Sequence, residues 1–268
     1  MKNRMKTIAL NCLIYTLKTK EVKDNLYLSI FHIWLGKVIQ SGGLTENDIL
    51  KITIDLRTLD YYSNTSTPLP LLLKKLQCQY QFIPIEPPSN SLEGMMNKYL
   101  FTEYTQDVWI YSDIDILISN PFSTMVEQTK DNTAYFCRED YFSDKNHGEG
   151  FNTNVDASLP GFSAGKFVIC GSVLRNSFFN IIHNACDYSS NYETVEQPIF
   201  NYAIYSIPRD KVSIDIDLLT KHVSFNGDEN TYNKDITIFN DMAGNVANGE
   251  SHVKRILDTM SLYFIGIY

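Results

Sequence analysis

The chain has 268 residues, of which 44% are hydrophobic and 20% are charged, and its formal net charge is −8. This composition is that of a globular protein, and the length is sufficient for one large hydrophobic core. An acidic chain without a cluster of Lys and Arg argues against a nucleic-acid partner, because phosphate contacts provide most of the affinity for nucleic acids. No apolar run reaches the roughly 18 to 20 residues that a membrane-spanning helix needs, so no transmembrane segment is expected.

The first 120 residues alternate between apolar, strand-like runs and amphipathic, helix-like segments. The predicted strands are 7–15, 49–56, 80–85 and 108–111, and the predicted helices are 22–40, a short one within 66–79, and 92–104. This alternation indicates an α/β protein whose parallel sheet carries helices on both faces. In such sheets, ligands bind at the carboxyl ends of the strands.

The remaining residues mix shorter strands and helices with two long polar loops. The predicted elements are helices 121–130, 172–188, 193–205 and 248–260, strands 133–137, 162–170, 211–216 and 235–239, and loops 138–160 and 222–235. Because no linker, internal repeat or low-complexity tract interrupts the chain, we expect a single domain spanning residues 1–268.

The segment 107–122 contains the clearest candidate for a functional site. An apolar strand runs directly into Asp113-Ile114-Asp115, and both aspartates point to the same side because side chains alternate along an extended chain. Adjacent carboxylates repel each other, and a cation between them removes that repulsion. Hard oxygen ligands suit Mg²⁺ or Mn²⁺. The alternative is two solvated aspartates in a turn, and the apolar residues before, between and after them argue against it.

The five cysteines are scattered along the chain, without a Cys-x-x-Cys motif or a zinc-binding spacing with histidine. They are Cys12, Cys78, Cys137, Cys170 and Cys186. We therefore expect reduced thiols in a reducing compartment, which predicts a cytoplasmic location.

Four segments resemble those of a known family and occur in the same order. They are a helix that contains Lys98, the strand with the Asp-x-Asp motif at 109–115, the segment 162–169 (Phe-Ser-Ala-Gly-Lys-Phe-Val-Ile), and the segment 196–201 (Glu-Gln-Pro-Ile-Phe-Asn). A weaker fifth match, 238–244, is similar to a His-x-x-Gly segment that supplies the third metal ligand of that family. Together the segments resemble the nucleotide-sugar-dependent glycosyltransferases of the GT-A fold, and most closely family 8, the type of glycogenin and the lipopolysaccharide galactosyltransferases.

The resemblance implies a GT-A fold, with a mostly parallel central sheet flanked by helices. Residues 1–120 would form the nucleotide-binding half, and residues 121–268 the half that binds donor sugar and acceptor. The implied activity is metal-dependent transfer of a sugar from a nucleotide-diphosphate sugar, with a UDP-sugar as the expected donor. The implied acceptor is a glycan, a protein or a lipid-linked molecule, the implied cofactor is Mn²⁺ or Mg²⁺, and the implied outcome is retention of anomeric configuration.

The resemblance also assigns metal ligands. Asp115 is the expected direct ligand, and Asp113 bridges the metal and the ribose. Asp241 stands where the family has its histidine, three residues before Gly244, and Asn240 lies next to it. Aspartate also binds Mn²⁺, so Asp241 is the expected third ligand, with a capping or surface aspartate as the alternative.

Further donor-binding positions follow from the same resemblance. Lys98 would hold the diphosphate or the donor sugar, with a solvated helix face as the alternative. Lys254 is closest to the phosphate-binding lysine of the family, although its spacing is stretched. Ser163 and Gly165 would allow close approach of the backbone to the sugar.

The catalytic positions are assigned in the same way. Glu196 would hydrogen-bond sugar hydroxyls, with helix capping as the alternative, and Gln197 would lie beneath the anomeric carbon. From the residues alone, Asn11 and Asp55 are expected near strand carboxyl ends, where they could contact base and ribose or provide ordinary strand-end polarity.

The loop 138–160 supplies candidates for acceptor binding. Tyr141, Phe142 and Phe151 could stack on sugar faces, with core packing of a folded-over loop as the alternative, and His147 could contact the acceptor.

Three departures from the family pattern support a second interpretation. The metal-binding histidine is replaced, and Ser163 and Glu196 stand where the family has Asn and Asp. A non-catalytic nucleotide- or sugar-binding module is therefore the main alternative. An Asp-x-Asp phosphotransferase of the haloacid-dehalogenase type is less favoured, because its motif normally follows the first strand and here it follows the fourth.

Overall fold

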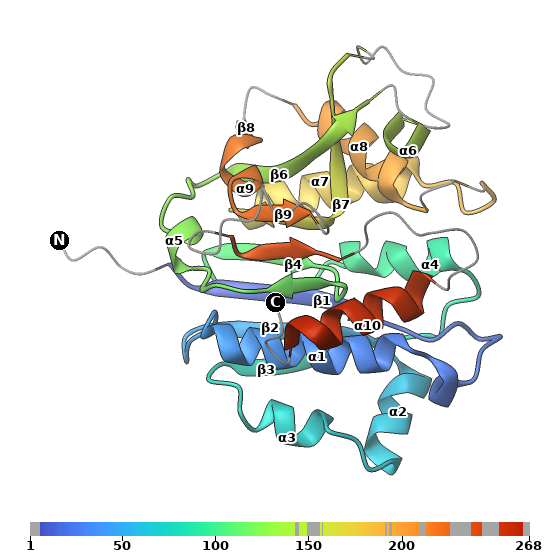
Figure 1. The fold of residues 1–268 in the computed structure, drawn as a ribbon. Coiled ribbons are helices and arrows are strands. Elements are labelled where there is room, and N and C mark those ends of the chain that lie inside the picture. Colours follow the sequence, from blue (N-terminus) through green and yellow to red (C-terminus); the bar gives the residue numbers. More distant parts are fainter. Residues whose placement is uncertain are drawn as a thin grey trace.

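A mixed sheet forms the centre of the molecule in the computed structural model (Figure 1). The structure describes residues 6–142, 145–148, 156, 158–190, 192, 195–208, 213–225, 237–242 and 252–264. Within these residues the main sheet has seven strands in the order β3-β2-β1-β4-β7-β6-β8. They are β1 (Ile8–Ile14), β2 (Ile49–Asp55), β3 (Gln79–Ile85), β4 (Val108–Ser112), β6 (Thr133–Tyr141), β7 (Pro160–Ile169) and β8 (Ser213–Asp215).

The direction of the strands confirms the predicted α/β architecture and refines it. The strands β1 to β4 are mutually parallel where they pair, whereas β7 runs antiparallel to both β4 and β6. β1 pairs with β2 on one side and with β4 on the other, so the order of the strands reverses between β1 and β4. Such a switch point is where open α/β sheets bind their ligands.

Helices cover both faces of the sheet. They are η1 (Val22–Asp24), α1 (Tyr27–Ser41), α2 (Leu56–Asn64), α3 (Leu69–Leu73), α4 (Ser91–Met96), η2 (Asn97–Tyr99), α5 (Ser123–Val126), α6 (Lys145–Gly148), α7 (Ser172–Ala185), α8 (Gln197–Ser206), α9 (Asp217–Thr220) and α10 (His252–Phe264). Both α3 and α10 contact α1.

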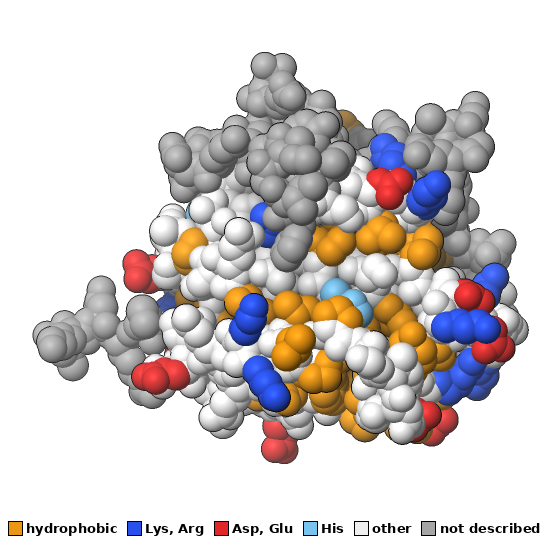
Figure 2. All heavy atoms as spheres, turned by 60° about the horizontal axis from the view of Figure 1, so that its bottom comes forward, with side chains coloured by type: hydrophobic (Ala, Val, Ile, Leu, Met, Phe, Trp, Pro, Cys, Tyr) orange, Lys and Arg blue, Asp and Glu red, His pale blue; other side chains and the backbone are white. Residues whose placement is uncertain are grey.

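On the face shown in Figure 2, hydrophobic side chains gather in a band, and charged side chains lie mostly along its margins.

Two hydrophobic clusters lie on opposite faces of the strands, as side-chain alternation requires. Leu10 and Ile110 belong to the cluster that packs against α1 and α10. Their neighbours Ala9 and Trp109 belong to the cluster that packs against α7 and α8, which is rich in phenylalanine. Strands β1 and β4 are buried throughout, and this explains their continuous apolar sequences.

A second, smaller sheet pairs β5 (Ile116–Ile118), β10 (Phe239–Asp241) and β9 (Val223–Phe225). β10 runs antiparallel to β5 and parallel to β9. The strand predicted at 235–239 is described only from residue 237, and there the observed strand β10 is confined to Phe239–Asp241. The loop predicted at 222–235 contains β9 near its start. This sheet joins the segment after the Asp-x-Asp motif to a distant part of the chain.

Several predicted boundaries were wrong. The predicted helix 92–104 ends at Tyr99, and the predicted helix 121–130 is confined to Ser123–Val126. Helix α2 was not predicted; it begins directly after β2 because both backbone amides of Arg57 and Thr58 donate to the Asp55 carboxylate.

Within the described residues, no helix combines the length and apolar character needed to cross a membrane.

Because of the buried imidazole of His32, we expect the folded protein to lose stability in acid. It lies on α1 against Tyr62, with 5.6 Å between ring centroids, and its Nε2 is buried without a hydrogen-bond partner. Burial lowers the pKa of His32 from 6.5 to about 4. The unfolded chain therefore binds a proton between pH 6.5 and pH 4 that the folded chain does not, and stability falls as pH falls through this window. We expect His32→Gln to reduce this slope in urea unfolding at pH 7 and pH 4.5. If the free energy of unfolding falls by the same amount between pH 7 and pH 4.5 in the parent and in the variant, the prediction is contradicted.

Candidate functional site

The Asp-x-Asp pair leaves the sheet at its switch point. Asp113 follows the last residue of β4, and its backbone amide donates to the carbonyl of Gly165 on β7 at 2.7 Å. Asp115 follows two residues later and directly precedes β5. The predicted position of the pair, at the carboxyl end of the fourth strand, is therefore confirmed.

The smaller sheet brings Asp241 to the same place. Asp241 pairs in register with Ile116, and the amide of Met242 donates to the Asp115 carbonyl at 3.2 Å. Burial, and after it the negative charges of Asp113 and Asp241, raise the pKa of Asp115 to about 7. Asp115 is thus close enough to Asp113 and to Asp241 for their charges to repel its own, although Asp241 is more than a hundred residues away in sequence.

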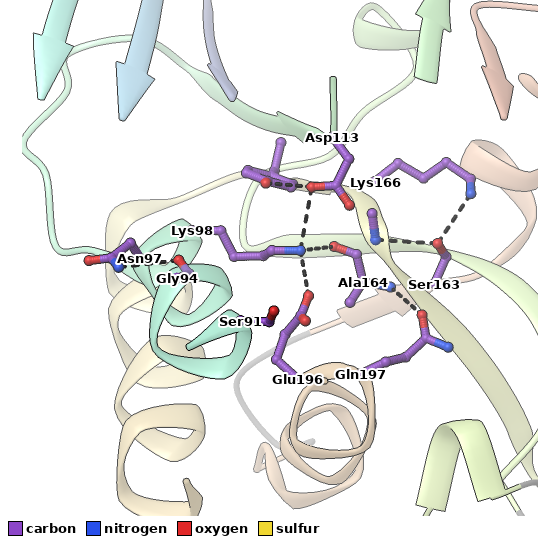
Figure 3. Close-up of polar contacts among 12 residues, drawn as sticks. Ser91, Gly94, Asn97, Lys98, Asp113, Ser163, Ala164, Lys166, Glu196 and Gln197 are labelled. Carbon is purple, nitrogen blue, oxygen red and sulfur yellow. Dashed lines mark hydrogen bonds and ion pairs between the residues drawn. The ribbon is translucent and has the colours of Figure 1, made fainter. Parts of the chain in front are cut away.

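Lys98 lies between two carboxylates in the interior (Figure 3). Its ammonium group is 3.5 Å from Asp113 Oδ1, donates to the carbonyl of Ala164 at 3.3 Å, and forms an ion pair with Glu196 Oε1. The Lys98 side chain is fully buried, so the solvated helix face considered from the sequence is excluded. Burial acts to lower the pKa of Lys98, but Asp113 and then Glu196 outweigh it and raise the pKa. The hydroxyl of Tyr111 also donates to Asp113 Oδ1, at 2.6 Å.

Gly165 makes room for the Asp113 carboxylate. A Cβ atom at position 165 would lie 3.0 Å from Asp113 Oδ2 and 3.3 Å from Ile116 Cδ1. Both contacts are tighter than side chains normally tolerate, so a glycine here lets β7 pass close to the aspartate. The structure therefore places Gly165 beside a predicted ligand of the metal.

Side chains in the first turns of α8 form hydrogen bonds with the backbone of β7. The side-chain carbonyl of Gln197 accepts a hydrogen bond from the amide of Ala164 at 3.2 Å. Asn201, one turn later, accepts from the amide of Phe162 at 2.7 Å and donates to the same residue's carbonyl at 2.8 Å. Glu196, the residue before the helix, makes no capping hydrogen bond with its side chain, which excludes the capping alternative. Its carboxylate is instead held by Lys98.

Lys166 is a site residue that the sequence reasoning missed. Its buried ammonium group contacts Asp241 Oδ2 at 2.8 Å, Ser163 Oγ at 3.2 Å and Glu139 Oε1 at 3.5 Å. Burial acts to lower the pKa of Lys166, and Asp241 is the main influence that outweighs it and raises the pKa. A lysine inside an otherwise apolar strand was the available signal, because such a cation needs a buried carboxylate partner.

Glu139 was also missed, and it links Lys166 to His147. The Nε2 atom of His147 is 3.6 Å from Glu139 Oε2, and the side chain of His147 is buried. Although burial acts to raise the pKa of Glu139, its contact with His147 and the charge of Lys166 lower it. His147 therefore packs inside the protein beside a charged cluster.

The other acceptor candidates lie apart from this cluster or outside the described residues. Tyr141 is 49% exposed, and the guanidinium of Arg138 lies over its ring at 5.3 Å from the centroid. Phe151 lies outside the residues that the structure describes.

Asn11 and Asp55, two of the predicted donor-binding residues, use their side chains to hydrogen-bond backbone groups of the fold. β1 continues to Ile14, so Asn11 lies within the strand and not at its end, and its amide donates to the carbonyls of Ala9 and Ile110. Asp55 is fully buried and accepts from the amides of Thr16, Arg57 and Thr58. Backbone groups thus occupy both carboxylate oxygens of Asp55.

Asn240 lies in the smaller sheet, on β10, and Lys254 lies on α10. Asn240 is buried, accepts from Ser224 Oγ at 2.6 Å and donates to Ser119, so it holds the smaller sheet together. Its neighbour Asp241 points to the other side of that sheet. Lys254 is exposed on α10.

The resulting site contains two buried lysines, each held between carboxylates. No group of three or more His, Cys, Asp or Glu side chains in the described residues is arranged to hold a metal ion. Lys166 contacts Asp241 and Lys98 contacts Asp113, so these lysines already neutralise part of the acidic charge. The chemistry of Asp113 and Asp115 nevertheless fits a hard divalent cation that two carboxylates hold together with phosphate oxygens.

Comparison with known proteins finds no protein-family model and no curated protein that matches this chain.

Proposed function

We propose that this chain is a metal-dependent glycosyltransferase that uses a nucleotide-diphosphate sugar as donor. One observation carries the proposal: Asp113 and Asp115 follow the strand at which the order of the parallel strands reverses, and the pairing of β10 with β5 brings Asp241 next to Asp115. Open α/β sheets bind nucleotides at this position, and a cluster of carboxylates that repel one another favours a cation. The resemblance of the Asp113, Gly165 and Gln197 segments to family-8 enzymes of the GT-A fold supports the same conclusion.

The proposed reaction exchanges one bond at the anomeric carbon. The oxygen of an acceptor hydroxyl bonds to C1 of the sugar, and the bond from C1 to the donor phosphate oxygen breaks. The bonding electrons remain on the nucleoside diphosphate, and the hydroxyl proton passes to the departing phosphate oxygen. Mn²⁺ or Mg²⁺, when bound, stabilises the negative charge that grows on this phosphate.

The residues of the chain would orient the donor. Asp115 and Asp113 would hold the metal, with Asp241 as a third ligand after Lys166 releases it. Lys98 and Lys166 would then place positive charge next to the donor, which offsets the acidity of the site. Glu196 would accept hydrogen bonds from sugar hydroxyls, and Gln197 would lie beneath the anomeric carbon.

The identity of donor and acceptor follows only from the resemblance. We propose a UDP-sugar as donor, a glycan, protein or lipid-linked acceptor, and retention of configuration. The anomeric proton signals of the product in NMR distinguish retention from inversion. All five cysteines are free thiols, which supports a reducing compartment such as the cytoplasm.

Thermal unfolding with a panel of nucleotides and nucleotide sugars, with and without Mn²⁺, tests the proposal. We expect at least one uridine or guanosine diphosphate sugar to raise the melting temperature only with Mn²⁺, because a ligand that binds the native state stabilises it. Asp115→Asn is expected to lose this response, and Asp24→Asn, which changes an exposed aspartate, serves as its matched control. The proposal fails if no nucleotide shifts the melting temperature.

A non-catalytic nucleotide- or sugar-binding module is the second candidate. The ion pair between Lys166 and Asp241 favours it, because a lysine already occupies the third expected metal ligand. Nucleotide binding without transfer or hydrolysis of any donor sugar would select the module over the enzyme.

A further inference from the structure

A polar cavity lies at the edge of the sheet opposite to the Asp-x-Asp pair. Its volume is about 510 Å³, within the range of small-molecule sites. Its walls come from the first residues of β2 and β3, the segment before β4 and the first turn of α7. These are the amino ends of the parallel strands, so the cavity is separate from the site described above.

Two buried cations line this cavity. Lys51 is 2% exposed and Arg175 is 3% exposed, and both contribute to the cavity wall. Burial lowers the pKa of Lys51, and the positive charge of Arg175 lowers it further. Two buried like charges next to each other destabilise a fold unless an anion compensates them.

The part of the chain that the structure describes supplies no close anion. Within the described residues neither Lys51 nor Arg175 has a carboxylate within ion-pair distance. Lys51 donates to the backbone carbonyl of Glu103, and Arg175 donates to the carbonyl of Thr102 and the side-chain carbonyl of Asn176. The carboxylate of Glu103 is exposed at the rim, and its charge offsets that of Lys51 only partly.

Hydrogen-bond donors remain available on both cations. The guanidinium has five N–H bonds, and Nε, Nη1 and Nη2 use one each. One N–H therefore remains on each terminal nitrogen of Arg175. The ammonium of Lys51 uses one of its three N–H bonds. The face of Tyr104 lies 4.5 Å from the guanidinium and holds it in place.

We propose that this cavity binds a small anionic ligand through a phosphate group, with Lys51 and Arg175 as the phosphate-binding residues. Arginine with two terminal N–H bonds and an adjacent ammonium group is a donor set suited to phosphate. The start of α7 adds the positive end of a helix dipole. The remaining wall is polar, with Gln79, Gln81 and Gln106 available for the hydroxyl or amide groups of the ligand. This proposal is independent of the proposed glycosyltransferase activity.

Titration of the full chain with inorganic phosphate tests the proposal. The measurement is made by calorimetry and thermal unfolding, with EDTA present and ionic strength held constant with chloride. We expect saturable binding that raises the melting temperature of the parent. Lys51→Met is expected to weaken binding at least tenfold, whereas Lys74→Met, which changes an exposed lysine away from the cavity, leaves it unchanged.

A second variant keeps the test decisive if Lys51→Met does not fold. Gln81 is exposed at the cavity wall, so Gln81→Glu introduces a carboxylate without disturbing the core. We expect Gln81→Glu to abolish the phosphate response. A response that survives in Gln81→Glu, or one that chloride reproduces at equal ionic strength, overturns the proposal.

Discussion

Asp115→Asn is expected to stabilise the metal-free protein at pH 8 and to abolish its response to Mn²⁺ and nucleotide. The pKa of Asp115 is raised from 3.8 to about 7, primarily by burial and then by Asp113 and Asp241. Between these values the folded state binds a proton that the unfolded state does not, so stability falls as pH rises through this window. Asparagine carries no charge at any pH and lacks this penalty.

The expected gain in stability of Asp115→Asn follows from the size of the pKa shift of Asp115. One pKa unit corresponds to about 1.4 kcal/mol. Because partial exposure screens the charge, we expect Asp115→Asn to gain about 1 to 3 kcal/mol at pH 8 and almost nothing at pH 4. Urea unfolding in EDTA at both pH values measures this, with Asp24→Asn as the control. A variant that is less stable than the parent at pH 8, or that keeps the Mn²⁺-dependent response, contradicts the assignment of Asp115.

Lys98→Met is expected to be among the most destabilising substitutions in the chain. The ammonium group of Lys98 lies between Asp113 and Glu196, and its side chain is fully buried. Methionine fills similar space but leaves the buried Glu196 carboxylate without its cation. Breaking a buried ion pair in this way costs about 3 to 5 kcal/mol. Urea unfolding at pH 7 measures the loss.

A double variant separates this cause from poor packing. In Lys98→Met with Glu196→Gln, the unpaired charge is absent, so at least half of the lost stability should return. If Lys98→Met loses less than about 1 kcal/mol, or if the double variant is no better than the single one, then the ion pair is not what holds this part of the site together.

The elements that the sequence predicted well are those with long, uniform burial. Strands β1 and β4 were predicted to within one or two residues because each is an apolar run buried on both faces. The position of Asp113 followed, since the motif comes directly after such a strand. The strands β5, β9 and β10 have three residues each, which is too short for a periodic pattern.

Residue roles that depend on distant partners were not predictable. Lys166 and Glu139 meet only because β6 and β7 pair, and although a lysine inside an apolar strand signals a buried partner, the sequence does not say which carboxylate that partner is. Conversely, Asn11 and Asp55 are polar residues near strand ends, but the structure uses their side chains to satisfy backbone groups. A polar residue near a strand end is therefore ambiguous until its partners are known.

The pairing of β5 with β10 also determines when the site can form during synthesis. Asp113 and Asp115 are made early, and β5 follows them at once, but its partner strand ends at Asp241. The two aspartates thus leave the ribosome well before the strand that completes their surroundings, and Lys166 emerges between the two events. Contacts of such long sequence separation form late in folding. The nascent chain therefore passes through a stage in which the part that contains β1 to β4 can fold while Asp113 and Asp115 still lack Asp241 and Lys166.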